Sequence, residues 1–193
     1  GVMHLDDQRP VQRDTIFRIY SMSKAITSAA ALILVEEGKI DLDAPVSQYL
    51  PQFANLQVFD GEEIRPAKHP LTVTDLFLHT AGITYGSAGG NRTEQMFEAV
   101  DVLDKDSDLE LMPTKLGQLP LSFDSGQDWQ NGASIDVLGR VVEVASGQAL
   151  DEFLEERIFQ LLGMTDTAFF VPPEKQARFA FGSRLRTAPT GRK

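Results

Sequence analysis

The stretch SMSK contains the two residues of this sequence whose types and spacing suit catalysis best, Ser21 and Lys24. Side chains three positions apart lie on one face of a helix, so the lysine amine can reach the serine oxygen. A serine hydroxyl is a weak nucleophile until a nearby base removes its proton. A lysine is such a base only where burial or neighbouring positive charge lowers its pKa from about 10.4. The pair therefore suits attack by Ser21 with Lys24 as the proton acceptor.

The same spacing also suits an ordinary helix start. In that interpretation Ser21 caps the helix and Lys24 is a solvated residue of its first turn. About one accidental S-x-x-K match is expected in a chain of this length, so the spacing alone favours the structural interpretation. One detail opposes it, because a lysine in the first turn is repelled by the positive end of the helix dipole. At the level of spacing, both interpretations stay open.

Helices are the elements expected to position this pair. Apolar residues at helical spacing predict a helix over 21–37, begun by Ser21 as its N-cap and ended by Gly38. A second, short helix is expected to end before Pro51.

More helices and very little strand are expected further along the chain. Thr72 and Asp75 have the spacing of a capping box, and their helix is expected to end at Gly82. Residues 104–128 are expected to form a loop. The remaining predicted elements are a hairpin turning at Asp60-Gly61, helices near 93–103, over 134–146 and over 150–163, and a short strand over 167–171.

Composition excludes several classes of protein. The 193 residues carry a formal net charge of −10, which argues against a nucleic-acid partner, and 42% of them are apolar, which is typical of a globular protein. The absence of cysteine excludes disulfides and thiolate catalysis. Apolar runs are far shorter than a membrane span and no signal peptide is visible. We therefore expect no membrane partner and a cytoplasmic location, with the periplasm left open.

The two ends of the chain differ from the rest. The chain opens with Gly1 rather than Met, which suggests a processed or partial product. The end RLRTAPTGRK is basic, and an unstructured end or a truncation scar is favoured over an arm for a nucleic acid or an acidic partner. We expect one partial domain over 1–180 and a disordered basic tail over 181–193.

The stretch DTIFRIYSMSKAITSAAALILVEEGKIDLDAPVSQYLPQF closely resembles the nucleophile region of the class C β-lactamase-like serine hydrolases. That superfamily includes class C β-lactamases, D-alanyl-D-alanine carboxypeptidases and family VIII carboxylesterases. The resemblance continues in the same order through LTVTDLFLHTAGITYG and DVLGRVVEVASGQALDEFLEERIFQLLGMTDTAFFVPPEKQARFA, and it covers about residues 5–180. Among the members, the esterase-like branch looks most similar.

The resemblance implies that Ser21 is the acylated nucleophile and Lys24 its proton partner. It implies an α+β fold of the β-lactamase/transpeptidase type, of which this chain holds mainly the helical domain and few strands. It also implies a small-molecule ester, amide or β-lactam as the substrate, and no metal or organic cofactor.

Two departures from the superfamily pattern affect this interpretation. Members carry a tyrosine two positions after the tryptophan of SGQDWQNGASIDVLG, whereas this position is Asn131 here. An amide cannot replace a phenolate base, so Asn131 either hydrogen-bonds a substrate or is an ordinary loop residue. The second departure is that the superfamily's first strands and its K-T-G or H-G-G strand are not found in this chain. A homo-oligomer is one way to complete such a fold.

Two further questions have alternative answers. His79 in LHTAG is either a triad histidine or a structural residue at a helix end, and the resemblance favours the structural role. The chain as a whole is either a serine hydrolase that forms an acyl-serine or a catalytically silent relative that acts as a binding or interaction module. Asn131 and the missing third motif motivate the silent alternative.

Overall fold

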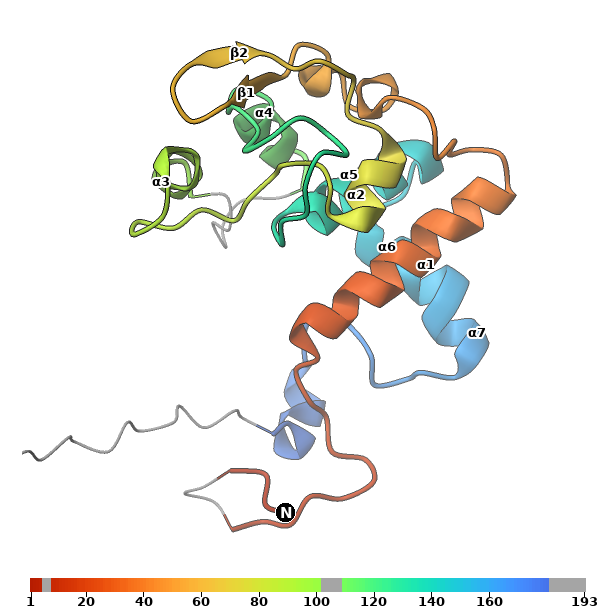
Figure 1. The fold of residues 1–193 in the computed structure, drawn as a ribbon. Helices are drawn as coiled ribbons and strands as arrows, with labels where there is room; N and C mark the ends of the chain where they lie inside the picture. The colour runs from red at the N-terminus through yellow and green to blue at the C-terminus, as the bar shows by residue number, and fades with distance from the viewer. Residues whose placement is uncertain (5–7, 102–108, 181–193) are drawn as a thin grey trace, which may run out of the picture.

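The computed structural model describes residues 1–4, 8–101 and 109–180, which form a cluster of helices with one small hairpin (Figure 1). The predicted basic tail over 181–193 lies outside the described residues. The helix predicted near 93–103 is found over Arg92–Ala99, so it ends earlier than predicted, with Val100 as its C-cap. Within the described part, no helix combines the length and the apolar character needed to cross a membrane. The main elements are α1 (Ser23–Glu36), β1 (Gln57–Phe59), β2 (Ile64–Pro66), α2 (Val73–Leu78), α3 (Arg92–Ala99), α4 (Met112–Leu116), α5 (Ser134–Ser146), α6 (Leu150–Leu154) and α7 (Gln160–Leu162).

The helix that follows the SMSK serine begins two residues later than predicted. α1 starts at Ser23, its N-cap position is Met22, and no side chain caps it. Ser21 lies instead in a short 3-10 helix over Tyr20–Met22, whose entry residue Tyr20 has a φ of +45°. The prediction that Ser21 is the N-cap is therefore wrong. The free N–H groups at the start of the helix donate to backbone carbonyls of this tight turn, so no side chain is needed to cap them. The Ser21 hydroxyl remains available for another partner.

The core is built where α1, α5 and α6 pack against one another (Figure 1). Ala30 and Ala31 of α1 are fully buried. A Cβ at Gly139 of α5 would lie 3.0 Å from Leu150 Cδ2, so small residues allow these helices to approach closely. The predicted helix over 134–146 is confirmed, and Gly147 ends it in the left-handed conformation with φ of +75°. Four further α5 residues are fully buried in this core, namely Val137, Leu138, Val141 and Val142.

The predicted hairpin is confirmed and is fixed to a distant loop. β1 and β2 pair in antiparallel register, and Gly61 supplies the positive φ of +102° in the turn. Arg65 of β2 donates two hydrogen bonds to the buried Asp124 carboxylate, at 3.2 and 2.7 Å. Phe59 N–H also donates to Leu121 O at 2.9 Å. The hairpin and the 121–124 segment therefore form one unit.

The capping box at the start of α2 is confirmed, but the helix ends earlier than predicted. Asp75 N–H donates to Thr72 Oγ1 at 3.3 Å, and Thr72 N–H donates to Asp75 Oδ2 at 3.0 Å. The helix ends at Leu78 because His79 adopts the left-handed conformation, with φ of +58°. The prediction of an end at Gly82 is wrong by one turn. Residues 80–85 then run as irregular chain.

Three predictions for the second half of the chain differ from the structure in whole or in part. The segment expected as a loop over 104–128 contains the short helix α4. The helix predicted over 150–163 is confirmed as α6 and α7, joined through a π-helical turn over Glu155–Phe159. Among the described residues, 167–171 forms no strand, and the strand predicted there is wrong. The nearest strand-like pairing joins Ile16 to Phe179 instead, with Ile16 N–H donating to Arg178 O at 2.9 Å.

Candidate active site

Ser21 and Lys24 lie together at the start of α1. Lys24 Nζ donates a hydrogen bond to Ser21 Oγ over 3.1 Å. Ser21 is exposed and Lys24 is half-buried, so the pair lies at the surface of the protein. The predicted reach of the lysine to the serine is confirmed. The geometry comes from a 3-10 turn that leads into α1, rather than from one regular helix.

A tyrosine ring lies on another side of the lysine. Lys24 Nζ lies 5.8 Å from the centroid of the Tyr85 ring, which is within the range of a cation–π contact. The Tyr85 hydroxyl donates a hydrogen bond to Asp136 Oδ2 over 3.3 Å. Tyr85 belongs to the irregular chain after α2, and Asp136 belongs to the first turn of α5. Three separate segments therefore meet at Lys24.

The electrostatics of this group favour a neutral phenol. Burial raises the pKa of Tyr85 far above its usual value, and the negative charge of Asp136 and the hydrogen bond to it raise it further. Burial also raises the pKa of Asp136, while the hydrogen bond from Tyr85 and the positive charge of Lys24 oppose that rise. At neutral pH Tyr85 is therefore a hydrogen-bond donor, and it cannot serve as a phenolate base.

His79 combines the predicted structural role with a position beside the site. It ends α2 in the left-handed conformation, and its carbonyl accepts a hydrogen bond from Gln130 N–H at 3.0 Å. Burial lowers the pKa of His79, and the charge of Lys24 lowers it further, so the imidazole is neutral at pH 7. Its Nδ1 is buried and has no hydrogen-bond partner among the described residues. Its ring lies 6.1 Å from that of Trp129, centroid to centroid.

Asn131 lies in the same segment as Trp129 but does not join the group around Lys24. It is exposed, and within the described residues no hydrogen bond holds its side chain. Trp129 is 64% exposed, so the 129–131 segment presents both side chains to solvent. The structure therefore brings Ser21 and Lys24 together and leaves the predicted substrate contact of Asn131 as a prediction.

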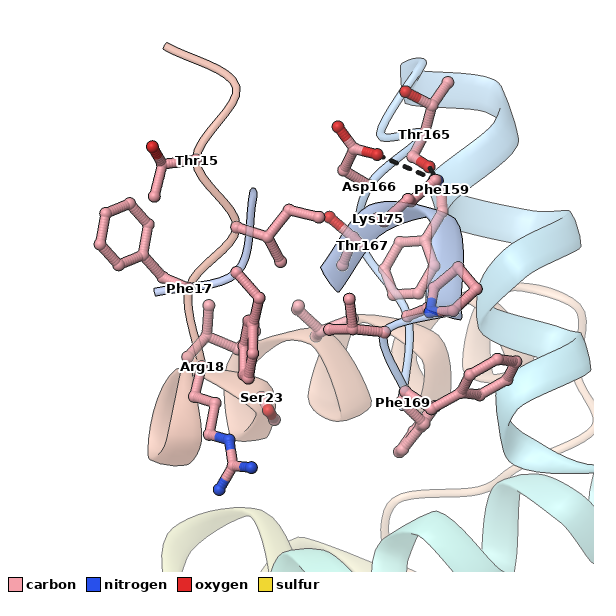
Figure 2. A pocket seen from close by; sticks show the side chains of 18 of the residues that line it. Thr15, Phe17, Arg18, Ser23, Phe159, Thr165, Asp166, Thr167, Phe169 and Lys175 are labelled. Carbon is pink, nitrogen blue, oxygen red and sulfur yellow. Dashed lines mark hydrogen bonds and ion pairs between the residues drawn. The ribbon is translucent and has the colours of Figure 1, made fainter. Parts of the chain in front are cut away.

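A cavity lies next to the turn that carries the serine, but Ser21 does not line it. It has a volume of about 890 Å³ and lies between the 13–20 segment, the first turns of α1 and the 165–172 segment (Figure 2). Ser23 and Tyr20 line it, whereas Ser21 and Lys24 do not. Several aromatic side chains in its wall are exposed, with Phe169 at 64% and Phe170 at 72%. The cavity is thus an open apolar groove behind the turn that carries the serine.

Sequence reasoning missed Tyr85 and Asp136. A usable signal was present for Asp136, because it is the one acid in the apolar run SIDVLG, whose neighbours Ile135 and Val137 are buried. A carboxylate beside a buried helix face is costly unless it has a partner, so such a residue indicates a specific interaction. No comparable signal marked Tyr85, whose position beside Lys24 depends on how α2 and α5 pack.

Comparisons with known proteins show similarity over most of the chain. A family model described as Beta-lactamase matches residues 1–193. Esterase EstB of Burkholderia gladioli is 37% identical over 183 residues, which are 92% of this chain and 44% of that protein. Lovastatin esterase of Penicillium rubens is 31% identical over 170 residues, which are 85% of this chain and 42% of that protein.

A solved structure extends the similarity to the fold. EstCE1, described as a hydrolase with promiscuous acyltransferase activity, has a TM-score of 0.80 and 28% identity, covering 93% of this chain and 46% of that chain. The chain therefore spans about half the length of the relatives that it matches. The predicted fold class is confirmed: the described residues are mainly the helices of an α+β, β-lactamase-like fold, with one two-stranded sheet. Because the family model covers the whole sequence, the chain belongs to the beta-lactamase family.

Proposed function

We propose that this chain carries the nucleophile of a serine hydrolase that cleaves a small-molecule ester through an acyl-serine intermediate. The observation that carries the proposal is the 3.1 Å hydrogen bond between Lys24 Nζ and Ser21 Oγ. Two relatives are named as esterases, which supports an ester as the substrate class ahead of an amide or a β-lactam.

The proposed chemistry uses Lys24 twice. Ser21 Oγ attacks the carbonyl carbon while its proton moves to Lys24 Nζ, which must be a neutral amine at that moment. The carbonyl electrons move onto oxygen, where the backbone N–H of Ser21 is one hydrogen-bond donor. When the intermediate collapses, the alcohol leaves with the proton from Lys24. Water then attacks the acyl-serine in the same way and releases the carboxylic acid.

Asn131 is proposed as a substrate contact in this scheme. Its exposed amide can donate to or accept from a bound ester, but it cannot take up a proton as a phenolate does. The proton transfers therefore rest on Lys24.

The test is covalent labelling of the serine. The chain is treated with a fluorophosphonate probe, digested, and mapped by peptide mass, and p-nitrophenyl butyrate turnover is measured in parallel. We expect the label on Ser21 and none on Ser21→Ala. Ser23→Ala is the matched control, because Ser23 is exposed on the same turn and does not bond to Lys24. An unlabelled Ser21 in folded wild-type protein would contradict the proposal.

A catalytically silent relative is the second candidate. Asn131 in place of the expected tyrosine favours it, and so does the exposed aromatic wall of the groove beside α1, which suits a binding partner or a second copy of the chain. This candidate predicts no ester turnover in wild type and none in Asn131→Tyr. Turnover that disappears in Ser21→Ala would rule it out.

A further inference from the structure

Lys24 is held on more than one side, although the proposed mechanism uses only its bond to Ser21. A lysine side chain has four methylene groups and loses considerable rotamer entropy when it is held in one place. The hydrogen bond to an exposed serine is a weak restraint by itself. The face of the Tyr85 ring, 5.8 Å from Lys24 Nζ, is a second restraint that comes from a different segment.

The Tyr85 ring is itself held by Asp136. The phenol hydroxyl donates to Asp136 Oδ2 over 3.3 Å, and the two residues lie 51 positions apart in the chain. Asp136 stands on α5, the helix against which α1 packs. The position of the ring relative to Lys24 therefore depends on the packing of α1 against α5, the helix pair that forms much of the core.

Neither residue has a role in the steps of ester cleavage given above. Tyr85 is a neutral phenol whose hydroxyl is already occupied by a carboxylate, so it does not replace the tyrosine that is absent at position 131. Asp136 is flanked by the buried residues Ile135 and Val137, where an acid is costly without a function or partner. Their shared neighbour is Lys24.

We propose that Tyr85 and Asp136 form a positioning pair that holds the Lys24 amine against Ser21. Tyr85 provides a ring face beside the protonated amine, the form of Lys24 between proton transfers, and Asp136 holds the hydroxyl end of that ring in place by accepting the phenol hydrogen bond. The catalytic consequence rests on the proposed function of Ser21, whereas the positioning itself does not.

The positioning is tested without any activity assay, by NMR of the full chain with 13C-labelled lysine. Protons above an aromatic face resonate upfield, so the Lys24 ε-methylene signal is expected upfield of the other lysines, with Lys24→Arg providing its assignment. Tyr85→Leu removes the ring, and the signal should move to the position of a solvated lysine. Tyr85→Phe keeps the ring and should move it less. Tyr49→Phe, at a tyrosine whose hydroxyl bonds to Asp41 N–H instead, is the matched control and should leave the signal in place.

A second pair of variants tests the hydrogen bond. Asp136→Ala removes the acceptor and should move the Lys24 signal, whereas Asp136→Asn keeps an acceptor oxygen and should preserve most of the wild-type position. If Tyr85→Leu does not fold, the comparison of Asp136→Ala with Asp136→Asn still tests whether Lys24 is positioned in this way. An unmoved Lys24 signal in folded Asp136→Ala, or an equal displacement in Asp136→Asn and Asp136→Ala, would overturn the proposal.

The rate of fluorophosphonate labelling at Ser21 gives the functional readout. We expect Tyr85→Leu and Asp136→Ala to label about tenfold more slowly or worse, because a displaced base is no longer aligned with its nucleophile. The labelling rate should fall less in Tyr85→Phe than in Tyr85→Leu, and less in Asp136→Asn than in Asp136→Ala. If wild-type Ser21 is not labelled at all, the proposed function fails, while the NMR signals still decide the positioning pair. Equal labelling rates in wild type and in folded Tyr85→Leu would overturn the catalytic part.

Discussion

Lys24 Nζ lies 3.1 Å from Ser21 Oγ even though Ser21 precedes the first residue of α1. The 3-10 turn over Tyr20–Met22 brings the serine oxygen back over the start of the helix, where the lysine side chain can reach it. Because backbone carbonyls satisfy the N–H groups of this turn, the hydroxyl is not used for capping and keeps its partner. The same turn borders the apolar groove shown in Figure 2, and Ser23 is one of the residues that line this groove.

Lys24 should be required for acylation of Ser21. We expect Lys24→Ala to slow fluorophosphonate labelling by about 10²–10⁴-fold, the usual contribution of a positioned general base. Lys24→Arg should be equally slow, because a guanidinium keeps its proton and cannot accept another. Lys39→Ala is the matched control, since Lys39 pairs with Glu37 at the far end of α1. Wild-type labelling rates in both Lys24 variants would show that another group is the base.

Gly132 should be required for the position of Tyr85. A Cβ at Gly132 would overlap Ile83 O and lie 2.8 Å from Thr84 Cα, so an alanine must push the 83–85 segment away. We expect Gly132→Ala to lower the free energy of unfolding by about 1–3 kcal/mol, as overpacking typically does, and to slow Ser21 labelling as well. Urea unfolding and labelling rates measure the two effects. Gly89→Ala is the control, because nothing lies within 4 Å of a Cβ at Gly89.

Asp124 should be important for stability at neutral pH. Its side chain is only 5% exposed, and it accepts hydrogen bonds from Arg65 and from Lys68 N–H. We expect Asp124→Asn to lower the Tm by about 5 °C, because Arg65 loses a charged partner inside the protein. Asp60→Asn is the matched control, since Asp60 also bonds to Arg65 but is largely exposed, and its effect should be smaller. Equal losses in the two variants would contradict this ranking.

The same carboxylate should make stability depend on acid pH. The hydrogen bond from Arg65 is the main cause that holds the pKa of Asp124 far below its usual value, with the N–H of Lys68 adding to it. A lowered pKa in the folded state means that the contribution is complete above about pH 4, the ordinary range of an unfolded aspartate, and is lost as the pH falls. The stability difference between wild type and Asp124→Asn should therefore shrink in unfolding experiments carried out at about pH 2.5. A difference as large there as at pH 7 would contradict the assignment.

Local features of the sequence predicted local structure well. The Asp60-Gly61 turn, the Thr72–Asp75 capping box and the helix closed by Gly147 are all found as expected. Each depends on residues close together in the chain, whose backbone preferences and short hydrogen bonds act before any tertiary packing. The same locality explains why S-x-x-K predicted the contact between Lys24 and Ser21.

Predictions failed where packing overrode local preference. Ser21 suits an N-cap, but the chain enters α1 through a 3-10 turn, and α2 ends at Leu78, well before Gly82. The 167–171 stretch has the composition of a strand, yet a strand needs a neighbour to satisfy its N–H and C=O groups, and the described residues supply none there.

The sequence by itself determined the nucleophile candidate, its lysine and the family resemblance, because those are carried by residues adjacent in the chain. Only the tertiary structure decided what surrounds Lys24. Tyr85 and Asp136 are 51 positions apart, and they meet because α1 and α2 both pack against α5. Burial by distant segments is not written in any local pattern, and it is this burial that keeps the Tyr85 phenol neutral.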